Sequence, residues 1–169
     1  MLRRSPYRRG AKYSNETTLV NLEIDGVVPE HSSFPYDSQT QKYGMDIINP
    51  TIVLGNRKVK NFTLKFTAVN FSGPIIGCLV YVPEGTNVNS LTMGSVANKM
   101  YEPNQNVICN FVIPASDSSN ATCVVTSRLA RNLNSNDRIC LICGLPVGTD
   151  PGQSGKAYLT GTVNFSIKY

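Results

Sequence analysis

The sequence predicts an all-β protein, an eight-stranded antiparallel jelly-roll sandwich preceded by a disordered basic N-terminal arm. Three observations predict it: strand periodicity in nearly every segment, long uneven loops between the strands, and a cluster of basic residues at the start. At 169 residues and 41% hydrophobic residues, the chain has enough apolar side chains for one core. We expect a basic arm over 1–14 and a single jelly-roll domain over 15–169.

The first twelve residues account for the net charge of the chain. The first acidic residue is Glu16, and five basic residues precede it: Arg3, Arg4, Arg8, Arg9 and Lys12. Of the 16 basic residues, the other 11 balance the 11 acidic ones, so a neutral body carries a +5 arm. Such dense like charge repels itself and has no apolar partners to form a core, so a polyanion is the expected ligand of a disordered arm.

Strict alternation of apolar and polar residues predicts three strands with one buried and one wet face: 20–25, 61–68 and 158–169. Three runs are apolar on both faces and are expected to be central strands covered on both sides: 75–82, 107–113 and 139–145. Two weaker candidates complete the eight: 45–54, which Pro50 interrupts, and 121–131.

Long, uneven loops favour a Greek-key jelly roll over an up-and-down barrel with short hairpins. The longest loops are expected over 28–43 and 83–106, and turn residues mark 25–26, 83–85, 134–137 and 148–155. Ser90–Tyr101 has weak helical character, and we expect a loop there.

The chain offers no catalytic constellation, so we expect no enzyme. His31 is the only histidine and lies in a polar loop, and no Gly-x-Ser-x-Gly motif accompanies it. The segment ending in Gly155-Lys156 lacks the glycine and hydroxyl positions of a phosphate-binding loop.

The cysteines predict neither disulfides nor a metal site. Their number, five, is odd, and each lies in an apolar run, where a free thiol behaves as a small hydrophobe. Cys140 and Cys143 have the spacing of half a zinc site, but residues three apart on a strand point to opposite faces. We therefore expect no metal and no cofactor.

Nucleic acid is the partner that the charge pattern favours. In the arm, we expect Arg side chains to bind phosphates and Tyr side chains to stack on unpaired bases. The predicted binding residues of the arm are Arg3, Arg4, Tyr7, Arg8, Arg9 and Lys12. Tyr13 is a further candidate for stacking. In the body, a second basic group at a strand entrance joins that set: Arg57, Lys58 and Lys60. Arg128, Arg131 and Arg138 form a looser third group. For both body groups the alternative is edge-strand charge that prevents aggregation.

The sequence argues against a membrane span, a secretory signal and a transit peptide. No stretch reaches the 18 to 20 apolar residues of a membrane span, so no membrane partner is expected. The N-terminus has no apolar segment of a secretory signal, and Pro6 and Gly10 break the helix of a transit peptide. A short Arg cluster also resembles a nuclear localisation signal.

Two segments carry a resemblance to a known family. The opening is Met1-Leu2-Arg3-Arg4-Ser5-Pro6-Tyr7-Arg8-Arg9, and the chain closes with Arg138-Ile139-Cys140-Leu141-Ile142, a Gly/Pro loop and a last strand from Tyr158 to Tyr169. This layout resembles the capsid (coat) proteins of small circular single-stranded DNA viruses of the circovirus and nanovirus kind. The arm is shorter than theirs and the chain has no Trp, and an RNA satellite virus coat has the same layout.

The resemblance implies a capsid protein that self-assembles, as about 60 copies, into an icosahedral shell. It implies an arm that packages single-stranded nucleic acid, DNA favoured over RNA, and localisation in the virion and, during assembly, in the host nucleus. The resemblance does not indicate which host-cell receptor the shell binds. Two alternatives remain open: a cellular single-strand-binding β-barrel and a carbohydrate-binding jelly-roll module. A single-strand-binding barrel should show exposed aromatic and basic residues on a strand face. A carbohydrate-binding module should show Trp or clustered Tyr on its surface.

Overall fold

The computed structural model describes residues 12–23, 42–70, 74–86, 88, 106–114, 122–144 and 158–169. They contain nine strands: β1 (Ser14–Glu23), β2 (Lys42–Ile48), β3 (Arg57–Val69), β4 (Ile75–Val82), β5 (Val107–Ile113), β6 (Thr122–Ser127), β7 (Arg131–Leu133), β8 (Arg138–Gly144) and β9 (Tyr158–Lys168). The predicted arm residues Arg3, Arg4, Tyr7, Arg8 and Arg9, the histidine and most of both long loops lie outside the described residues. So does the segment of weak helical character.

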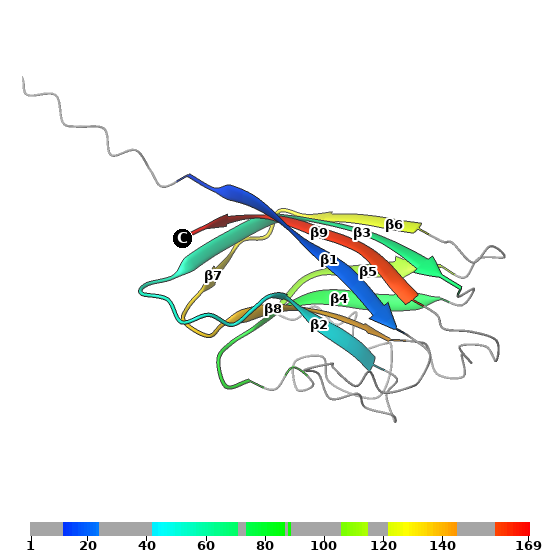
Figure 1. Ribbon diagram of the computed structural model, residues 1–169, viewed down its shortest axis with the longest axis horizontal. Helices are drawn as coiled ribbons and strands as arrows, with labels where there is room; N and C mark the ends of the chain where they lie inside the picture. Colours follow the sequence, from blue (N-terminus) through cyan, green and yellow to red (C-terminus); the bar gives the residue numbers. More distant parts are fainter. Residues whose placement is uncertain are drawn as a thin grey trace, which may run out of the picture.

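The strands form two antiparallel sheets packed face to face (Figure 1). The larger has the order β1-β9-β3-β6, with β7 beside β3, and the smaller has the order β2-β8-β4-β5. The pairs are nested along the chain, β1 with β9, β2 with β8, β3 with β6 and β4 with β5. A long antiparallel ribbon wrapped into two sheets in this way is a jelly roll, so the predicted fold class is confirmed.

Three of the strand predictions need correction. The segment 107–113 forms β5, an edge strand rather than a central one, and Val112 is 41% exposed there. The segment 121–131 is divided between β6 and the short β7. β2 ends at Ile48, before Pro50, because proline cannot donate a ladder hydrogen bond. Ser14, the last residue of the predicted arm, already belongs to β1.

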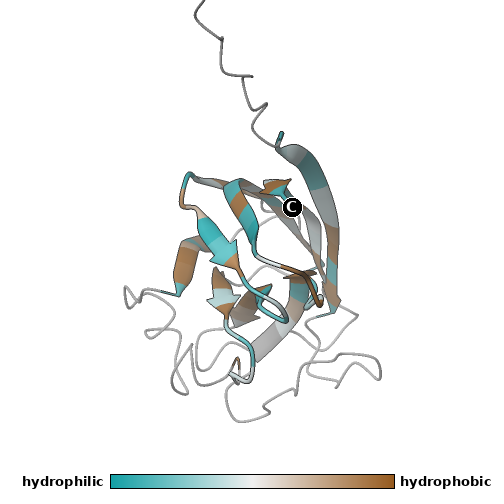
Figure 2. Cartoon of the chain, turned by 90° about the vertical axis from the view of Figure 1, so that its left-hand side faces the viewer, coloured by the Kyte–Doolittle hydropathy of each residue, from teal (hydrophilic) through white to brown (hydrophobic). Residues whose placement is uncertain are grey.

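The main core lies between the sheets. The alternating residues of β3, from Phe62 to Ala68, and of β9, from Leu159 to Ile167, supply much of it. Hydrophilic and hydrophobic bands alternate along the strands in Figure 2, as a sheet with one covered face requires. Phe66 packs against Phe111 with ring centroids 5.0 Å apart, and Gly77 leaves the room for that ring, since a Cβ there would lie 2.2 Å from it.

The smaller sheet is apolar on both faces. Ile75 and Leu79 of β4 face the main core. A second cluster occupies the opposite face, and its buried members are Cys78, Val80, Val82, Val88, Cys140 and Ile142. Because Val88, beyond the end of β4, packs in this cluster, the outer face of the smaller sheet is not open to a partner where the cluster lies.

Candidate nucleic-acid interface

The outer face of the larger sheet is polar and carries four lysines. Its residues alternate with the core residues of the same strands, and the ladder registers arrange them in rows across β9 and β3. Lys168 lies opposite Lys58, Ser166 opposite Lys60, and Thr162 opposite Lys65. The other outward residues of these two strands are mainly Thr and Asn.

Charge is unevenly distributed along this face. Three of the lysines lie within two neighbouring rows, and Lys65 lies about 13 Å beyond the row of Lys60 along the strands, given about 3.3 Å per residue. Glu23, the acidic residue that the described part of the chain places on this face, pairs with Tyr158 at the opposite end. We call the four side chains Lys58, Lys60, Lys65 and Lys168 the lysine face. The body is neutral as a whole, but this surface of it is basic.

A β-bulge puts Lys58 and Lys60 on the outer face. They have the same sequence parity as Phe62 and Leu64, so an unbroken strand would direct them to the same side as those core residues. The register of β3 against β9 shifts between Lys60 and Thr63, and Asn61 within that shift has a left-handed φ of 56°. The extra residue reverses the facing, and Asn tolerates this conformation better than most residues.

Tyr13 connects the arm to the lysine face. Its ring lies over the ammonium of Lys60, with 3.9 Å from Nζ to the ring centroid, which is a cation–π contact. Tyr13 directly precedes β1, whose first residue, Ser14, pairs with Ile167. The predicted site residue Lys12 is exposed at the same end of the sheet. The arm therefore joins the body beside the most basic part of the face.

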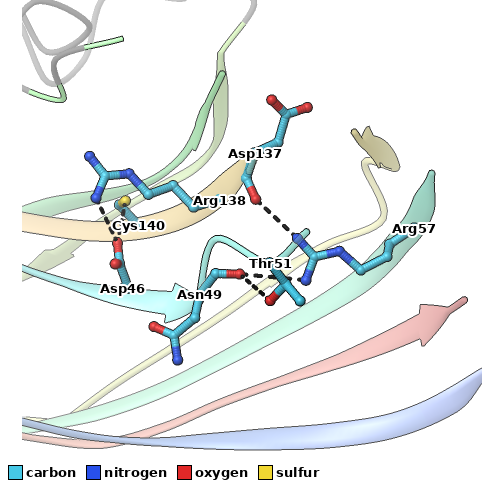
Figure 3. Close-up of polar contacts among 7 residues, drawn as sticks. All are labelled: Asp46, Asn49, Thr51, Arg57, Asp137, Arg138 and Cys140. Carbon is cyan, nitrogen blue, oxygen red and sulfur yellow. Dashed lines mark hydrogen bonds and ion pairs between the residues drawn. The ribbon is translucent and has the colours of Figure 1, made fainter. Parts of the chain in front are cut away.

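Arg57 does not belong to this surface, which corrects its prediction as a binding residue. Arg57 lies before the bulge and points to the same side of the strand as the buried Val59. Its side chain is therefore directed inward and is only 4% exposed. Its guanidinium donates to the carbonyl oxygen of Asp137 at 3.0 Å and, at the long distance of 3.5 Å, to that of Asn49 (Figure 3). Arg57 thus ties β3 to the residues that follow β2 and precede β8.

Asp137 organises the same end of the sandwich. Its carboxylate accepts hydrogen bonds from the Tyr81 hydroxyl at 2.7 Å, the Glu84 amide at 2.9 Å and the Asn134 amide at 2.7 Å. Burial, followed by the hydrogen bond to Asp137, raises the pKa of Tyr81 to about 12. These contacts fix two turns to β4 and have a structural role.

The third basic group does not form one patch. Arg138 belongs to the smaller sheet, where its guanidinium lies 3.6 Å from the Asp46 carboxylate (Figure 3). Arg128 is exposed after β6, and Arg131 is half-buried in β7. These three positions are therefore not joined to the lysine face as a group.

The cysteines are placed as small hydrophobes. Cys143 packs in the main core and Cys140 in the second cluster, so the two thiols diverge as their spacing predicts. The Cys140 thiol donates to Asp46 at 3.0 Å, and burial, then this hydrogen bond, raises its pKa. Burial also raises the pKa of Cys143 to about 12. Within the described ranges, no group of His, Cys, Asp and Glu has a metal-binding arrangement.

Sequence reasoning missed two of the four lysines. Lys65 and Lys168 stand alone among polar residues, so neither forms a basic run. The alternation of their strands nevertheless predicts that both lysines face solvent. The pairing of β3 with β9, which brings them onto one surface, cannot be predicted from local sequence.

Comparisons with known proteins do not identify a family for this chain. No protein-family model matches the chain, and no curated protein matches its sequence. Among solved structures it is similar to a chain of tomato aspermy virus, with 11% identity and a TM-score of 0.47, over 98% of this chain and 81% of that one. Desmodium yellow mottle tymovirus gives 10% identity and a TM-score of 0.33, over 98% and 94%.

A carbohydrate-binding module is also among the similar structures. The CBM36-1 domain of a xylanase from the hindgut metagenome of Trinervitermes trinervoides gives 9% identity and a TM-score of 0.33, over 89% of this chain and 96% of that one. At such identities and TM-scores the similarities assign no function. In the part of the chain that the structure describes, no helix is long and apolar enough to cross a membrane.

Proposed function

We propose that this chain is a viral coat protein that packages a single-stranded genome inside a shell of its own copies. The observation that carries the proposal is the convergence of two basic features at one end of an open jelly-roll sheet. The Arg-rich arm enters the fold at Tyr13 and Lys12, beside Lys58, Lys60 and Lys168. If the arms and the lysine faces are directed inward, both would bind the genome. The rest of the body is neutral, which suits contacts between copies.

The finer features of the proposal follow the sequence resemblance. The shell is a small icosahedron of about 60 copies closed by repeated heterologous contacts. Its genome is single-stranded DNA in preference to RNA, as in circovirus-like and nanovirus-like coats. The arm residues Arg3, Arg4, Tyr7, Arg8, Arg9 and Lys12 bind phosphates and bases. The same Arg cluster acts as a nuclear import signal before assembly in the host nucleus.

Exposed apolar side chains support the assembly part of the proposal. Ile52 is 83% exposed and Leu54 is fully exposed, in the segment that joins β2 to β3. The backbone of this segment is held in place, because Thr51 accepts from the Asn136 amide at 3.1 Å and the Val53 amide donates to Ser135 at 3.3 Å. Exposed apolar side chains that join into a continuous patch mark surfaces that bind another protein, and Ile52 and Leu54 lie two residues apart on this fixed segment. We assign them to a contact with a second copy.

The test is encapsidation by the purified, nuclease-treated chain. We expect uniform closed particles that protect nucleic acid, detected by size exclusion, negative-stain microscopy and the ratio of absorbance at nucleic-acid and protein wavelengths. Replacing the five arm cations with Ser should reduce the protected nucleic acid. Ile52→Ser with Leu54→Ser should abolish particles without lowering the melting temperature, whereas Leu19→Ser, which removes an apolar side chain 75% exposed on the lysine-bearing sheet, should leave assembly intact.

A single-strand-binding module is the second candidate, because Tyr13 and the lysine face give a strand surface the aromatic and basic residues that such modules use. The same experiment separates the two functions. A chain that binds single strands but remains monomeric at all salt and pH conditions is a binding module and not a coat protein. Binding to a polysaccharide without binding to nucleic acid would favour the carbohydrate-binding module instead.

A further inference from the structure

We infer that the folded body has its own site for single-stranded nucleic acid, where Tyr13 stacks on an unpaired base and Lys58, Lys60 and Lys168 contact the adjoining phosphates. This inference deepens the proposed function and takes its ligand class from it. It requires neither the arm cations nor assembly, so the site can fail while packaging by the arm of a self-assembling coat protein stands.

The geometry at Tyr13 allows an unpaired base to stack on its ring. The ammonium of Lys60 lies over the ring, 3.9 Å from the centroid, and this cation–π contact favours a ring position beside Lys60. Tyr13 is half-buried, so part of it remains accessible, and a ring covered by a cation on one face can stack a base on the other. Stacking on this ring requires an unpaired base, and so favours single strands over duplexes.

The lysines beside Tyr13 provide for phosphates. Lys58 and Lys168 are direct register partners on the outer face of adjacent strands, and like charges in that relation repel each other. Lys60 lies in the next row, opposite Ser166. A phosphate group between them would relieve the repulsion, and a chain of phosphates would do so along the rows.

The acidic residue on the outer face of this sheet is distant from the site. Glu16, three residues along β1 from Tyr13, pairs with the core residue Phe165 and so has the inward facing, and its carboxylate accepts hydrogen bonds from the Tyr169 and Ser14 hydroxyls. Among the described residues, Glu23 is the outward-facing carboxylate, and it lies ten residues along the β9 ladder from the row of Lys168, about 33 Å. Salt screens charges over about 8 Å at physiological ionic strength, so Glu23 does not weaken the positive potential at the lysine pair. In the described residues, the outer face of the opposite sheet carries a buried apolar cluster instead of a row of lysines.

The experiment measures binding of the full chain to an oligothymidylate and to a duplex of the same length, at concentrations where light scattering detects no particles. For single strands, the slope of log Kobs against log salt is about −0.7 per phosphate contacted. Replacing Lys58, Lys60 and Lys168 with Ser should make that slope about 2 smaller in magnitude. Lys42→Ser, which removes one cation from β2 in the other sheet, should leave the slope unchanged, whereas Lys168→Ser alone should change it by about 0.7.

Tyr13 is tested separately through affinity. Tyr13→Leu should weaken binding of the single strand by about 5-fold to 150-fold, with the slope unchanged and the duplex affinity unaffected. Tyr13→Phe keeps the ring and should retain the affinity. If Tyr13→Leu weakens single strand and duplex equally, or if the triple lysine variant keeps the wild-type slope, the body site does not exist. Particles that still protect nucleic acid in those variants would leave the coat-protein proposal intact, whereas a wild-type chain that neither binds single strands nor forms particles would refute both.

Discussion

The bulge at Asn61 decides which way Lys58 and Lys60 face, and substitution of Asn61 tests it. The φ of 56° lies in the left-handed region, where a β-branched side chain is strained by about 1–2 kcal/mol or more. For a domain of this size, each kcal/mol lowers the melting temperature by about 2–4 °C. We therefore expect Asn61→Val to lower it by about 2–8 °C, and Asn61→Gly to be nearly neutral because glycine adopts this conformation without a steric penalty.

The assay is thermal unfolding of the unassembled chain, with the free energy of unfolding in urea as a second measurement. Thr63→Val is the matched control, because Thr63 lies two residues on, on the same outer face, in the strand past the register shift. We expect that control to lie within about 0.5 kcal/mol of the wild type. If Asn61→Val were as stable as the wild type, the left-handed residue would be absent, and Lys58 and Lys60 would no longer be placed on the outer face.

Three further perturbations test the packing that supports this face. Gly161→Ala should destabilise the fold by about 3 kcal/mol or more, because its Cβ would lie 2.0 Å from the Lys65 carbonyl oxygen, and urea unfolding measures the loss. Asp137→Ala should cost more than about 3 kcal/mol, since it leaves three donors without their acceptor, whereas a loss below about 1 kcal/mol would contradict the three hydrogen bonds. The folded state raises the pKa of Tyr81 from 10 to about 12, so it holds this proton more tightly than the unfolded state does, and the resulting stability is complete below pH 10 and lost as the pH rises toward 12. Tyr81→Phe should make the urea midpoint fall less steeply over that interval, and an unchanged pH profile would count against the contact with Asp137.

The sequence predicted the architecture where one periodicity dominates. The alternation in 61–68 and 158–169 placed Phe62, Leu64, Phe66 and Val163 in the core, and the structure confirms all four. The segment 107–113 was wrongly expected in the centre of a sheet. An apolar run on both faces indicates burial but not position, and β5 is an edge strand that packs its inner face on the core.

The basic residues of the body could be predicted only in part. Arg57, Lys58 and Lys60 form one run in the sequence, yet Arg57 is buried and the two lysines face outward. Strand alternation separates Arg57 from the two lysines, but which of them faces outward depends on the bulge. The signal that would have indicated the bulge is an Asn between two alternating segments of opposite parity. Lys168 joins them through pairing between residues 110 positions apart, which no local pattern contains.

Electron cryo-microscopy of the nuclease-treated assembly is the measurement that tests the coat-protein account most directly. We expect closed icosahedral particles of about 60 copies, with the outer face of the β1-β9-β3-β6 sheet, and therefore Lys58, Lys60 and Lys168, directed toward density for nucleic acid in the interior. A chain that forms no closed particles in the presence of single-stranded nucleic acid, or a shell in which that sheet lines the exterior, would contradict the account.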